Sequence, residues 1–354
     1  MRLGRTGRAV VVGAVISVAL TIAGSAWASP YTTVSRLPGV PAVLSWILHS
    51  SNTKALSSSL QGELPKEEKS MFWGDSCASD PGGSAAATAC AFGDTSAQQT
   101  VVLYGDSFAL QWVPALSELG NAEHFKLVVY VRIGCPFANR AVRDYLGSID
   151  PGCLSFRSNV VTAINAIRPA PQLVLAAEDF YRTAPDGSSI SSKQWAAAVE
   201  STLTQLAVRR FPVGVVLGVP AAKLDPSHCL AAHASDVQAC NTPIGSAFST
   251  VADAKFTSAI RGSHAFVVNV SMLLCGNSCP DVLHNTLVHA DRWHLAASYV
   301  QSLARSFGSL VGCIGKRAPG RLVPAGGVLT RLLVPTGRPI NSACKAAIAR
   351  PFNL

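Results

Sequence analysis

Residues 100–113 read TVVLYGDSFALQWV, and this stretch decides the fold class. Val101–Tyr104 is a continuous apolar run rich in β-branched residues, which predicts a strand buried on both faces. After Gly105 and Asp106 the apolar residues recur with helical spacing, so the chain turns there from a strand into a helix. Ser107 stands at that turn, where the carboxyl end of a buried strand exposes its hydroxyl and helix amides lie nearby.

Short apolar runs that alternate with helical patterns continue along the chain. The predicted strands are Thr100–Tyr104, Lys126–Arg132, Gln172–Ala177, Val213–Val219 and Ala265–Val270, and the predicted helices include Leu154–Arg168, Ser191–Arg210 and Ala296–Ser309. This alternation predicts an α/β protein with three layers, α/β/α, around a mainly parallel five-stranded sheet of the flavodoxin-like kind. Ligands are expected at the carboxyl ends of the strands.

The first 28 residues have the features of an export signal. Three arginines in the first eight residues precede an apolar run over Ala9–Gly24, and Ala26-Trp27-Ala28 fits a cleavage site. The apolar stretch also approaches the length that spans a bilayer. We therefore expect residues 1–28 to be a signal peptide or a membrane anchor. In both cases the remainder is extracytoplasmic, either secreted or anchored.

All ten cysteines follow this N-terminal segment, and an even number in an oxidising compartment predicts disulfides. Their order along the chain suggests local pairs, although sequence leaves other connectivities open. The suggested pairs are Cys77 with Cys90, Cys135 with Cys153, Cys229 with Cys240, Cys275 with Cys279, and Cys313 with Cys344.

Composition divides the remaining chain into three parts. Residues 29–98, rich in Ser, Gly, Pro and Ala, predict a linker and a disulfide-tied segment that leads into the domain at 99–312, and residues 313–354 form a basic C-terminal extension. The formal net charge of +9 favours anionic envelope polymers or membrane surfaces, or simply solubility. The basic stretch lacks interleaved aromatic residues, so nucleic acid is not an expected partner.

A second motif, Asp291-Arg292-Trp293-His294-Leu295, precedes the last predicted helix. A serine hydroxyl is a weak nucleophile until a base takes its proton, and a carboxylate improves a histidine base by fixing its tautomer. Taken singly, Ser107 and Asp291 read equally well as helix caps and His294 as a structural histidine. Their combination favours a catalytic group of Ser107, His294 and Asp291.

Two other clusters have simpler interpretations. Cys275 and Cys279 with His284 and His289 offer enough donor atoms for a metal, but an exported chain favours a disulfide and incidental histidines. We therefore expect no metal and no cofactor. Glu178 and Asp179 are adjacent on an extended chain and point apart, which argues against the carboxylate pair of a glycosidase.

The motifs together carry a family resemblance. They comprise Cys90–Asp94, Val102–Ser107, Gln111–Leu116, Gly134–Pro136, Cys275 to Pro280, and Asp291–Leu295 with Tyr299. In these motifs the chain resembles the SGNH (GDSL-like) hydrolases, most closely the extracytoplasmic SGNH domain fused to membrane acyltransferases that O-acetylate bacterial envelope glycans. The resemblance implies Ser107 as nucleophile, His294 as base and Asp291 as its orienting acid.

Two departures from the family pattern concern the surroundings of the serine. Phe108 stands where this subgroup usually has histidine, and the asparagine that donates to the oxyanion in these hydrolases is not evident near Ala177–Phe180. Loss of one oxyanion donor costs about 10²–10³ in turnover. The expected remaining donors are the backbone amides of Ser107 and Gly134.

The resemblance implies an enzyme that acts on acyl esters, chiefly acetyl esters, of envelope carbohydrate through an acyl-serine intermediate. Esterase and O-acyltransferase remain equal alternatives, and a transferase would take its acyl group from a separate membrane acyltransferase. The alternative from another class is a non-catalytic SGNH-like module that binds envelope glycan or such a partner. An intact hydrogen-bonded arrangement of Ser107, His294 and Asp291 favours the enzyme.

Overall fold

The computed structural model describes residues 34–64, 72, 77–79, 86–144, 147–180, 183–206, 211–248 and 254–315. All of them fall within one structural unit, Thr33–Leu354. The predicted signal or anchor at 1–28 and residues 316–354 of the basic extension lie outside the described residues. No helix in the described part combines the length and apolar character that a membrane crossing requires.

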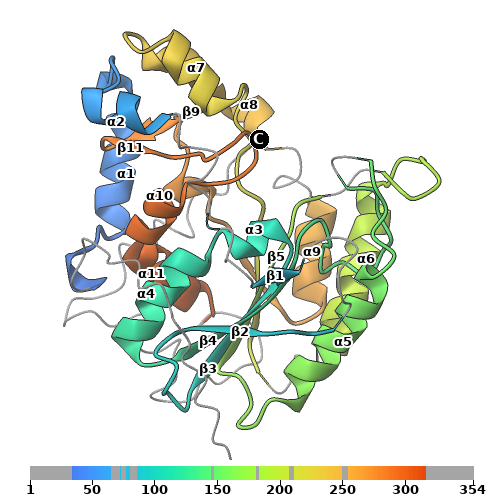
Figure 1. Ribbon diagram of the computed structural model, residues 1–354. Coiled ribbons are helices and arrows are strands. Elements are labelled where there is room, and N and C mark those ends of the chain that lie inside the picture. Colours follow the sequence, from blue (N-terminus) through green and yellow to red (C-terminus); the bar gives the residue numbers. More distant parts are fainter. Residues whose placement is uncertain are drawn as a thin grey trace, which may run out of the picture. The chain divides into compact units, whose positions relative to one another are not determined.

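Within the described ranges the main sheet has seven strands, and the five predicted ones are among them (Figure 1). The strands are β1 (Ala78–Ser79), β2 (Cys90–Gly93), β3 (Thr100–Gly105), β4 (Lys126–Arg132), β5 (Leu173–Ala177), β6 (Val213–Val216) and β8 (Phe266–Val268). Six run parallel in the order β1-β4-β3-β5-β6-β8, and β2 pairs antiparallel with β4. The mainly parallel sheet is confirmed. The predicted number of five is too low because β1 and β2 are too short to show a readable alternation.

Strand β3 lies inside the sheet, which explains its unbroken apolar sequence. Val101–Gly105 pairs with Leu127–Val131 of β4 on one side and with Leu173–Ala177 of β5 on the other. Val101 and Leu103 face one hydrophobic core, whereas Val102 and Tyr104 face a second. Both faces of the strand are therefore buried, as in parallel sheets generally.

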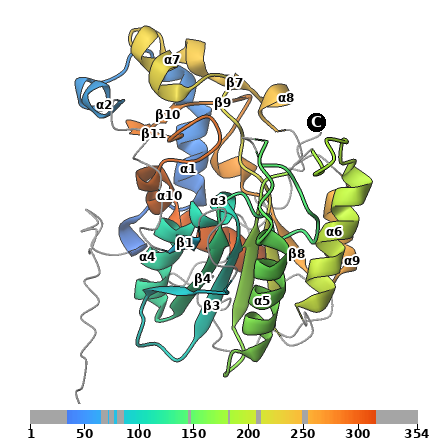
Figure 2. The same ribbon diagram turned by 45° about the vertical axis from the view of Figure 1, so that its right-hand side comes forward.

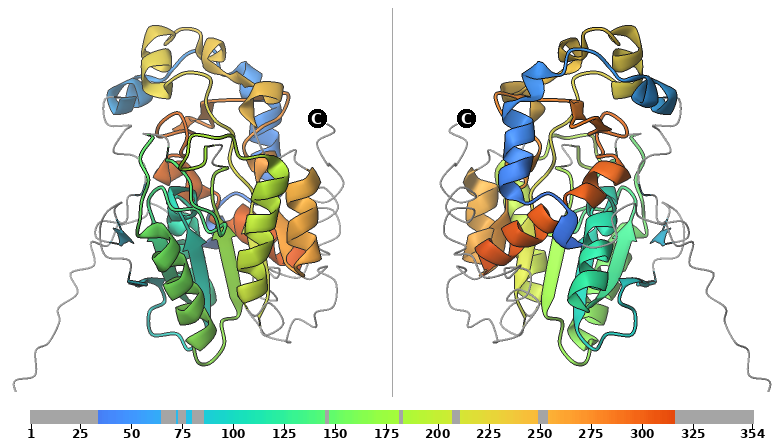
Figure 3. Two further views of the ribbon diagram at one scale, coloured as in Figure 1. Left: turned by 90° about the vertical axis from the view of Figure 1, so that its right-hand side faces the viewer. Right: turned by 90° about the vertical axis from the view of Figure 1, so that its left-hand side faces the viewer.

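Helices cover the two faces of the sheet and complete the three predicted layers (Figure 3). One face packs on α1 (Val40–Leu48), α4 (Val113–Glu123), α10 (Ala297–Ser302) and α11 (Ala304–Gly315), and the other on α5 (Cys153–Ala166), α6 (Ser192–Gln205) and α9 (Ala254–Gly262). Helix α6 begins with a capping box in which Ser191 and Gln194 satisfy each other's backbone amides. The single helix expected over Ala296–Ser309 is divided at Leu303 into α10 and α11.

The segment expected to be a linker contributes to the core in its described part. Val43 and Ile47 of α1 are buried in the same hydrophobic core as Leu103, and β1 and β2 extend the sheet. Because each of these elements is short, residues 29–98 show only weak periodicity, and the sequence did not predict the elements.

A small cap lies beyond the carboxyl ends of the strands (Figures 1 and 2). It contains α2 (Ser58–Glu63), α7 (Pro226–Ala232) and the hairpin β10 (Val282–Leu283) with β11 (Thr286–Leu287), held by a third apolar cluster that includes Leu60, Leu230 and Val282. The remaining short elements are α3 (Ser107–Leu110), α8 (Ile244–Ala247), β7 (Thr242–Pro243), β9 (Ser278–Cys279) and 3-10 turns at Val34–Arg36, Ser50–Asn52, Val237–Cys240 and Ser271–Leu273. The hairpin leads directly into the Asp291 motif.

Candidate active site

Ser107 is the first residue of α3, immediately after the carboxyl end of the central strand β3. The turn requires glycine at 105, because a side chain there would overlap the carbonyl oxygen of Ala177 on β5. Asp106 is the N-cap of α3, since its Oδ1 accepts a hydrogen bond from Phe108 N at 2.8 Å. Its Oδ2 accepts from Asp179 N at 3.3 Å, which ties the turn to β5. Asp106 thus holds the backbone of the turn.

Asp291 and His294 lie on the segment between β11 and α10. Asp291 Oδ1 accepts from the backbone N–H groups of Trp293 and His294 at 2.6 and 2.7 Å, which folds the segment into a tight turn. The other oxygen, Oδ2, lies 2.8 Å from His294 Nδ1. One carboxylate therefore fixes both the backbone of the turn and the orientation of the imidazole.

The structure brings the three predicted residues together. His294 Nε2 lies 2.9 Å from Ser107 Oγ, and the two residues are 187 positions apart in sequence. Ser107 and His294 are 6% and 7% exposed. With Asp291 on Nδ1, the neutral imidazole carries its proton there and presents a lone pair at Nε2 to the serine hydroxyl. Such a chain can remove the serine proton as the oxygen attacks a carbonyl carbon.

Asp291 is suited to remain ionised in this position. Burial raises the pKa of its carboxyl, but the hydrogen bond and charge of His294 and the two backbone N–H groups lower it, so that the pKa lies below its ordinary value of 3.8. An ionised carboxylate stabilises the imidazolium that forms when the serine gives up its proton.

Two further side chains hold the histidine in place. Gln111 Oε1 accepts from Leu295 N at 3.0 Å, and its Nε2 donates to Phe108 O at 3.1 Å, so this buried amide joins the two motifs. The Phe108 ring packs against the His294 imidazole with centroids 5.0 Å apart. Phe108 thus supplies an apolar wall where the resemblance leads one to expect a polar neighbour.

A histidine that the sequence interpretation set aside also supports the segment. His289 is fully buried, with Nδ1 2.8 Å from Asp281 Oδ1 and Nε2 3.1 Å from Pro220 O. His289 pairs with Leu295 in an isolated β-bridge, and Ala290 N donates to His294 O. The proximity of His289 to Asp291 in the sequence was the available signal for a supporting role. Nothing in the sequence indicates that the Asp281 side chain and the Pro220 carbonyl oxygen contact this histidine.

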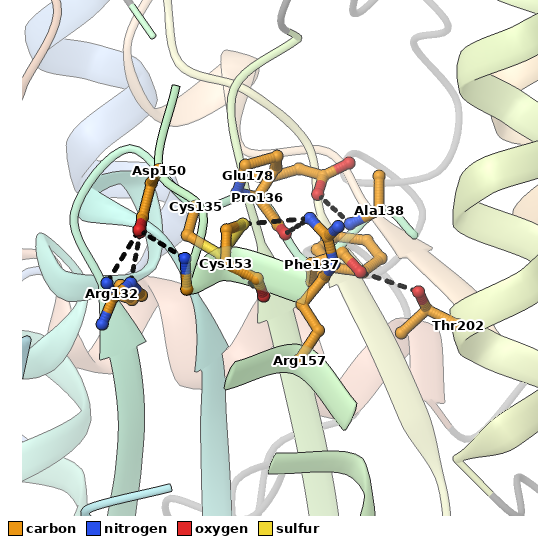
Figure 4. Close-up of a disulfide and its surroundings, with 11 residues drawn as sticks. Arg132, Cys135, Pro136, Phe137, Ala138, Asp150, Cys153, Arg157, Glu178 and Thr202 are labelled. Carbon is orange, nitrogen blue, oxygen red and sulfur yellow. Dashed lines mark hydrogen bonds and ion pairs between the residues drawn. A yellow bond between two sulfur atoms is a disulfide. The ribbon is translucent and has the colours of Figure 1, made fainter. Parts of the chain in front are cut away.

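The loop that follows β4 forms a second wall beside the β3 turn (Figure 4). Residues 135–138 of this loop are each held by a bond to another element: Cys135 by the disulfide to Cys153, Pro136 O by Arg157 Nη1 at 3.2 Å, Phe137 O by Thr202 Oγ1 at 2.7 Å, and Ala138 N by Glu178 Oε2 at 2.7 Å. Arg132 at the end of β4 forms a bidentate ion pair with Asp150, whose Oδ1 also accepts from Gly152 N. The loop is therefore preorganised.

Gly134 lies at the start of this loop, in a left-handed conformation with φ of +69° that favours glycine. No acceptor for the N–H of Gly134 or of Ser107 is found among the described residues. Neither amide is therefore satisfied by an acceptor in the described part. Their service as oxyanion donors stays a prediction.

Glu178 follows β5, where the family asparagine was sought. Burial and the negative charge of Asp106 raise the pKa of the Glu178 carboxyl well above its ordinary value of 4.5, despite the hydrogen bond from Ala138 N. The raised pKa favours the protonated form of this carboxyl, which faces the 134–138 loop through its hydrogen bond with Ala138 N.

The structure contains four of the five suggested disulfides, at 77–90, 135–153, 229–240 and 275–279. Cys344 and the side chain of Cys313 lie outside the described residues. His284 stacks on Trp46, with ring centroids 4.3 Å apart, and so lies apart from the Asp281–His289 pair. Across the described ranges, no three His, Cys, Asp or Glu side chains gather as a metal site.

Comparison with known proteins agrees with this geometry. The family model described as "SGNH domain (fused to AT3 domains)" matches residues 74–309, which is more than half of the chain. A search of curated protein sequences found no match.

Two solved structures match this chain. The periplasmic domain of a lipopolysaccharide acetyltransferase from Salmonella ser. Paratyphi A is 15% identical, with a TM-score of 0.50 over 60% of this chain and 83% of that one. A carbohydrate acetylesterase family member from Sinorhizobium meliloti is also 15% identical, with a TM-score of 0.36 over 60% of this chain and 97% of the other. At this identity the first likeness concerns the fold alone.

Proposed function

We propose, since this chain belongs to the family of SGNH domains of the type fused to AT3 domains, that it is a serine enzyme for acyl esters of envelope carbohydrate. The observation that carries the proposal is the continuous hydrogen-bonded chain from Ser107 Oγ through His294 to Asp291. Acetyl is the acyl group best supported, because the two solved structures of similar fold are named an acetyltransferase domain and an acetylesterase.

The first half-reaction forms an acyl-enzyme. Ser107 Oγ attacks the ester carbonyl carbon while its proton passes to His294 Nε2. The bond from that carbon to the alcohol oxygen then breaks, the imidazolium returns the proton to the leaving alcohol, and the acyl group remains on Ser107 as an ester. The backbone N–H groups of Ser107 and Gly134 are the proposed donors to the carbonyl oxygen while it carries negative charge.

The second half-reaction decides between esterase and transferase. His294 takes a proton from water or from a sugar hydroxyl as the oxygen of that molecule attacks the acyl carbon. The bond from the acyl carbon to Ser107 Oγ then breaks, and the imidazolium returns the proton to Ser107 Oγ. Water gives hydrolysis, and a sugar hydroxyl gives O-acylation of carbohydrate. In the second case a separate membrane acyltransferase is the proposed donor that acylates Ser107.

The location of the protein fits an envelope substrate. Four disulfides in the described part are typical of chains that mature outside the reducing cytoplasm. We therefore propose that the domain acts in an extracytoplasmic compartment, either secreted or held by the segment at 1–28.

A non-catalytic module that binds envelope glycan is the alternative, and two observations count against it. The imidazole is oriented by Asp291 and lies at hydrogen-bond distance from the serine, an arrangement that a binding module has no need to preserve. Burial raises the pKa of the Glu178 carboxyl well above its ordinary value, which reduces the negative charge that this residue places where the family asparagine was sought.

The test is hydrolysis of p-nitrophenyl acetate by the oxidised full chain, compared with Ser107→Ala and His294→Ala. Both variants are expected to lose turnover, by about 10³-fold or more, without change in the circular dichroism spectrum. Ser246→Ala and His228→Ala, which alter exposed side chains, are matched controls. Mass spectrometry of the intact parent chain should detect an acetyl group on Ser107. Equal turnover in parent and variants, or none in the parent, contradicts the proposal.

A further inference from the structure

Two exposed side chains lie directly beside the proposed reacting group. Trp293 is 41% exposed, whereas the tryptophans at 112 and 195 are each 1% exposed. Arg292 is exposed as well, and its guanidinium lies over the Trp293 ring, 4.9 Å from the centroid. A single exposed aromatic ring is ordinary, so the inference depends on where this ring lies and on which charges accompany it.

The position of Trp293 is fixed to the proposed catalytic group. Its backbone N–H donates to Asp291 Oδ1 at 2.6 Å, and the same carboxylate holds His294. Consecutive Cα atoms are only about 3.8 Å apart, so the backbone of Trp293 moves with the base. Trp293 therefore belongs to the same turn that carries the proposed base, one residue before it.

Arg292 is anchored to the loop after β6 but keeps its charge uncompensated. Ala222 N donates to Arg292 O at 2.8 Å, and Arg292 Nε donates to Ala222 O at 3.3 Å. Among the described residues no carboxylate pairs with Arg292. The next residue of that loop, Lys223, is exposed and likewise has no acidic partner in the described part.

Nearby carboxylates are engaged elsewhere. Asp291 holds His294, and Asp225 Oδ1 accepts from Ser227 Oγ and from His228 N. We call the surface formed by Lys223, Leu224, Arg292 and Trp293 the cationic rim. It combines an aromatic face with two positive charges that no carboxylate of the described part pairs, and two of its residues lie on the turn that carries His294.

We propose that the cationic rim binds an acidic carbohydrate, with a sugar ring against the Trp293 indole and a carboxylate of the glycan on Arg292. The apolar C–H face of a pyranose packs on an indole, and a guanidinium recognises a carboxylate through paired N–H donors. This inference rests on the proposed function and deepens it, because it specifies the carbohydrate as an anionic one such as a hexuronate polymer.

An anionic membrane surface is the competing occupant, since Leu224 is 50% exposed and tryptophan with basic residues also suits lipid headgroups. Membrane binding scales with the apolar area that is buried. Here only Trp293 and Leu224 offer such area, and the guanidinium occupies part of the indole face. The rim also adjoins the site that is proposed to act on carbohydrate. Both points favour the glycan.

The test measures binding without turnover. The full chain carrying Ser107→Ala is run in native gels that contain polygalacturonate, dextran or neither, and its retardation gives the affinity. We expect polygalacturonate to retard the chain and dextran to leave its migration unchanged. A second substitution in this chain, either Trp293→Ala or Arg292→Gln, should weaken the binding of polygalacturonate at least about fivefold. Arg261→Gln removes the same charge from exposed α9 and is the matched control for attraction by net charge alone.

The outcomes separate the alternatives. No retardation by polygalacturonate, or an equal loss with Arg261→Gln, overturns the proposal. Binding to phosphatidylglycerol vesicles that requires Trp293, without binding to polygalacturonate, assigns the rim to a membrane. Because the assay uses a chain without Ser107, it can succeed or fail whatever the ester hydrolysis assay shows.

Discussion

His289 Nδ1 lies 2.8 Å from Asp281 Oδ1, and neither side chain exposes more than 2% of its surface. The other ring nitrogen, Nε2, lies 3.1 Å from Pro220 O. Both nitrogens thus face acceptors, and only the imidazolium form donates from both. A buried hydrogen-bonded pair therefore joins the two ends of the β10–β11 hairpin, and the Pro220 contact ties it to the loop after β6, next to the segment that carries the proposed catalytic residues.

The first prediction concerns this pair. His289→Ala leaves the Asp281 carboxylate buried without its partner, which should lower the free energy of unfolding by about 3–5 kcal/mol. Chemical denaturation followed by circular dichroism measures the change. His228→Ala, which removes a histidine with a 90% exposed side chain from Asp225, should leave the unfolding free energy nearly unchanged. A His289→Ala chain as stable as the His228→Ala chain would show that the pair is unimportant.

The second prediction concerns the orienting acid. Asp291→Asn keeps an oxygen for the N–H groups of Trp293 and His294, but its amide group donates toward His294 Nδ1. The imidazole then carries its proton on Nε2 and cannot accept the Ser107 proton, so hydrolysis of p-nitrophenyl acetate should fall by about 10⁴-fold. Asp225→Asn alters an exposed Asp-x-x-His pair of the same spacing and serves as the control. Retained turnover in Asp291→Asn would remove Asp291 from the mechanism.

The third prediction concerns the disulfide beside the site. Replacing Cys135 and Cys153 together by serine opens a loop of 18 residues and should lower stability by about 3 kcal/mol. It should also reduce ester hydrolysis, because the Gly134 loop loses its covalent tie. The matched variant replaces Cys229 and Cys240, which staple the cap across 11 residues. It should lose similar stability and keep more turnover, and equal turnover in the two variants would argue against a preorganising role of the 135–153 bond.

The fourth prediction concerns pH and Glu178. Above the ordinary pKa of 4.5 the unfolded chain ionises this group, whereas the folded chain, in which burial raises the pKa, keeps it protonated. Raising the pH through this interval therefore costs stability. Glu178→Gln removes the cost and can still accept from Ala138 N.

Urea denaturation at several pH values from about 4.5 to about 8 tests this sign. The advantage of Glu178→Gln over the parent should grow as the pH rises. Glu200→Gln, at an exposed position of α6, should show no such trend. A pH-independent difference for Glu178→Gln would mean that the carboxyl is ionised in the fold.

The chain contains two Asp-x-x-His pairs that a sequence motif alone cannot distinguish. Asp225–His228 and Asp291–His294 have the same spacing, and both aspartates accept hydrogen bonds from the backbone of a turn or a helix start. From the sequence, Asp291 and His294 were selected through their combination with Ser107, and Asp225 and His228 were not weighed. The fold distinguishes them physically: His228 points into solvent, whereas His294 is buried against Phe108 and reaches Ser107.

The sequence by itself determined the parallel sheet, the position of Ser107 at the end of β3 and the choice of Asp291 with His294. These predictions follow from local patterns. The apolar run of a buried strand, the spacing of apolar residues in a helix and the residue types of a turn can all be recognised over a few neighbouring positions. The buried His289–Asp281 pair, the raised pKa of Glu178 and the cationic rim were decided by the tertiary structure alone. Each depends on burial and on partners brought from distant segments, and those determine charge state, orientation and exposure only once the chain is folded.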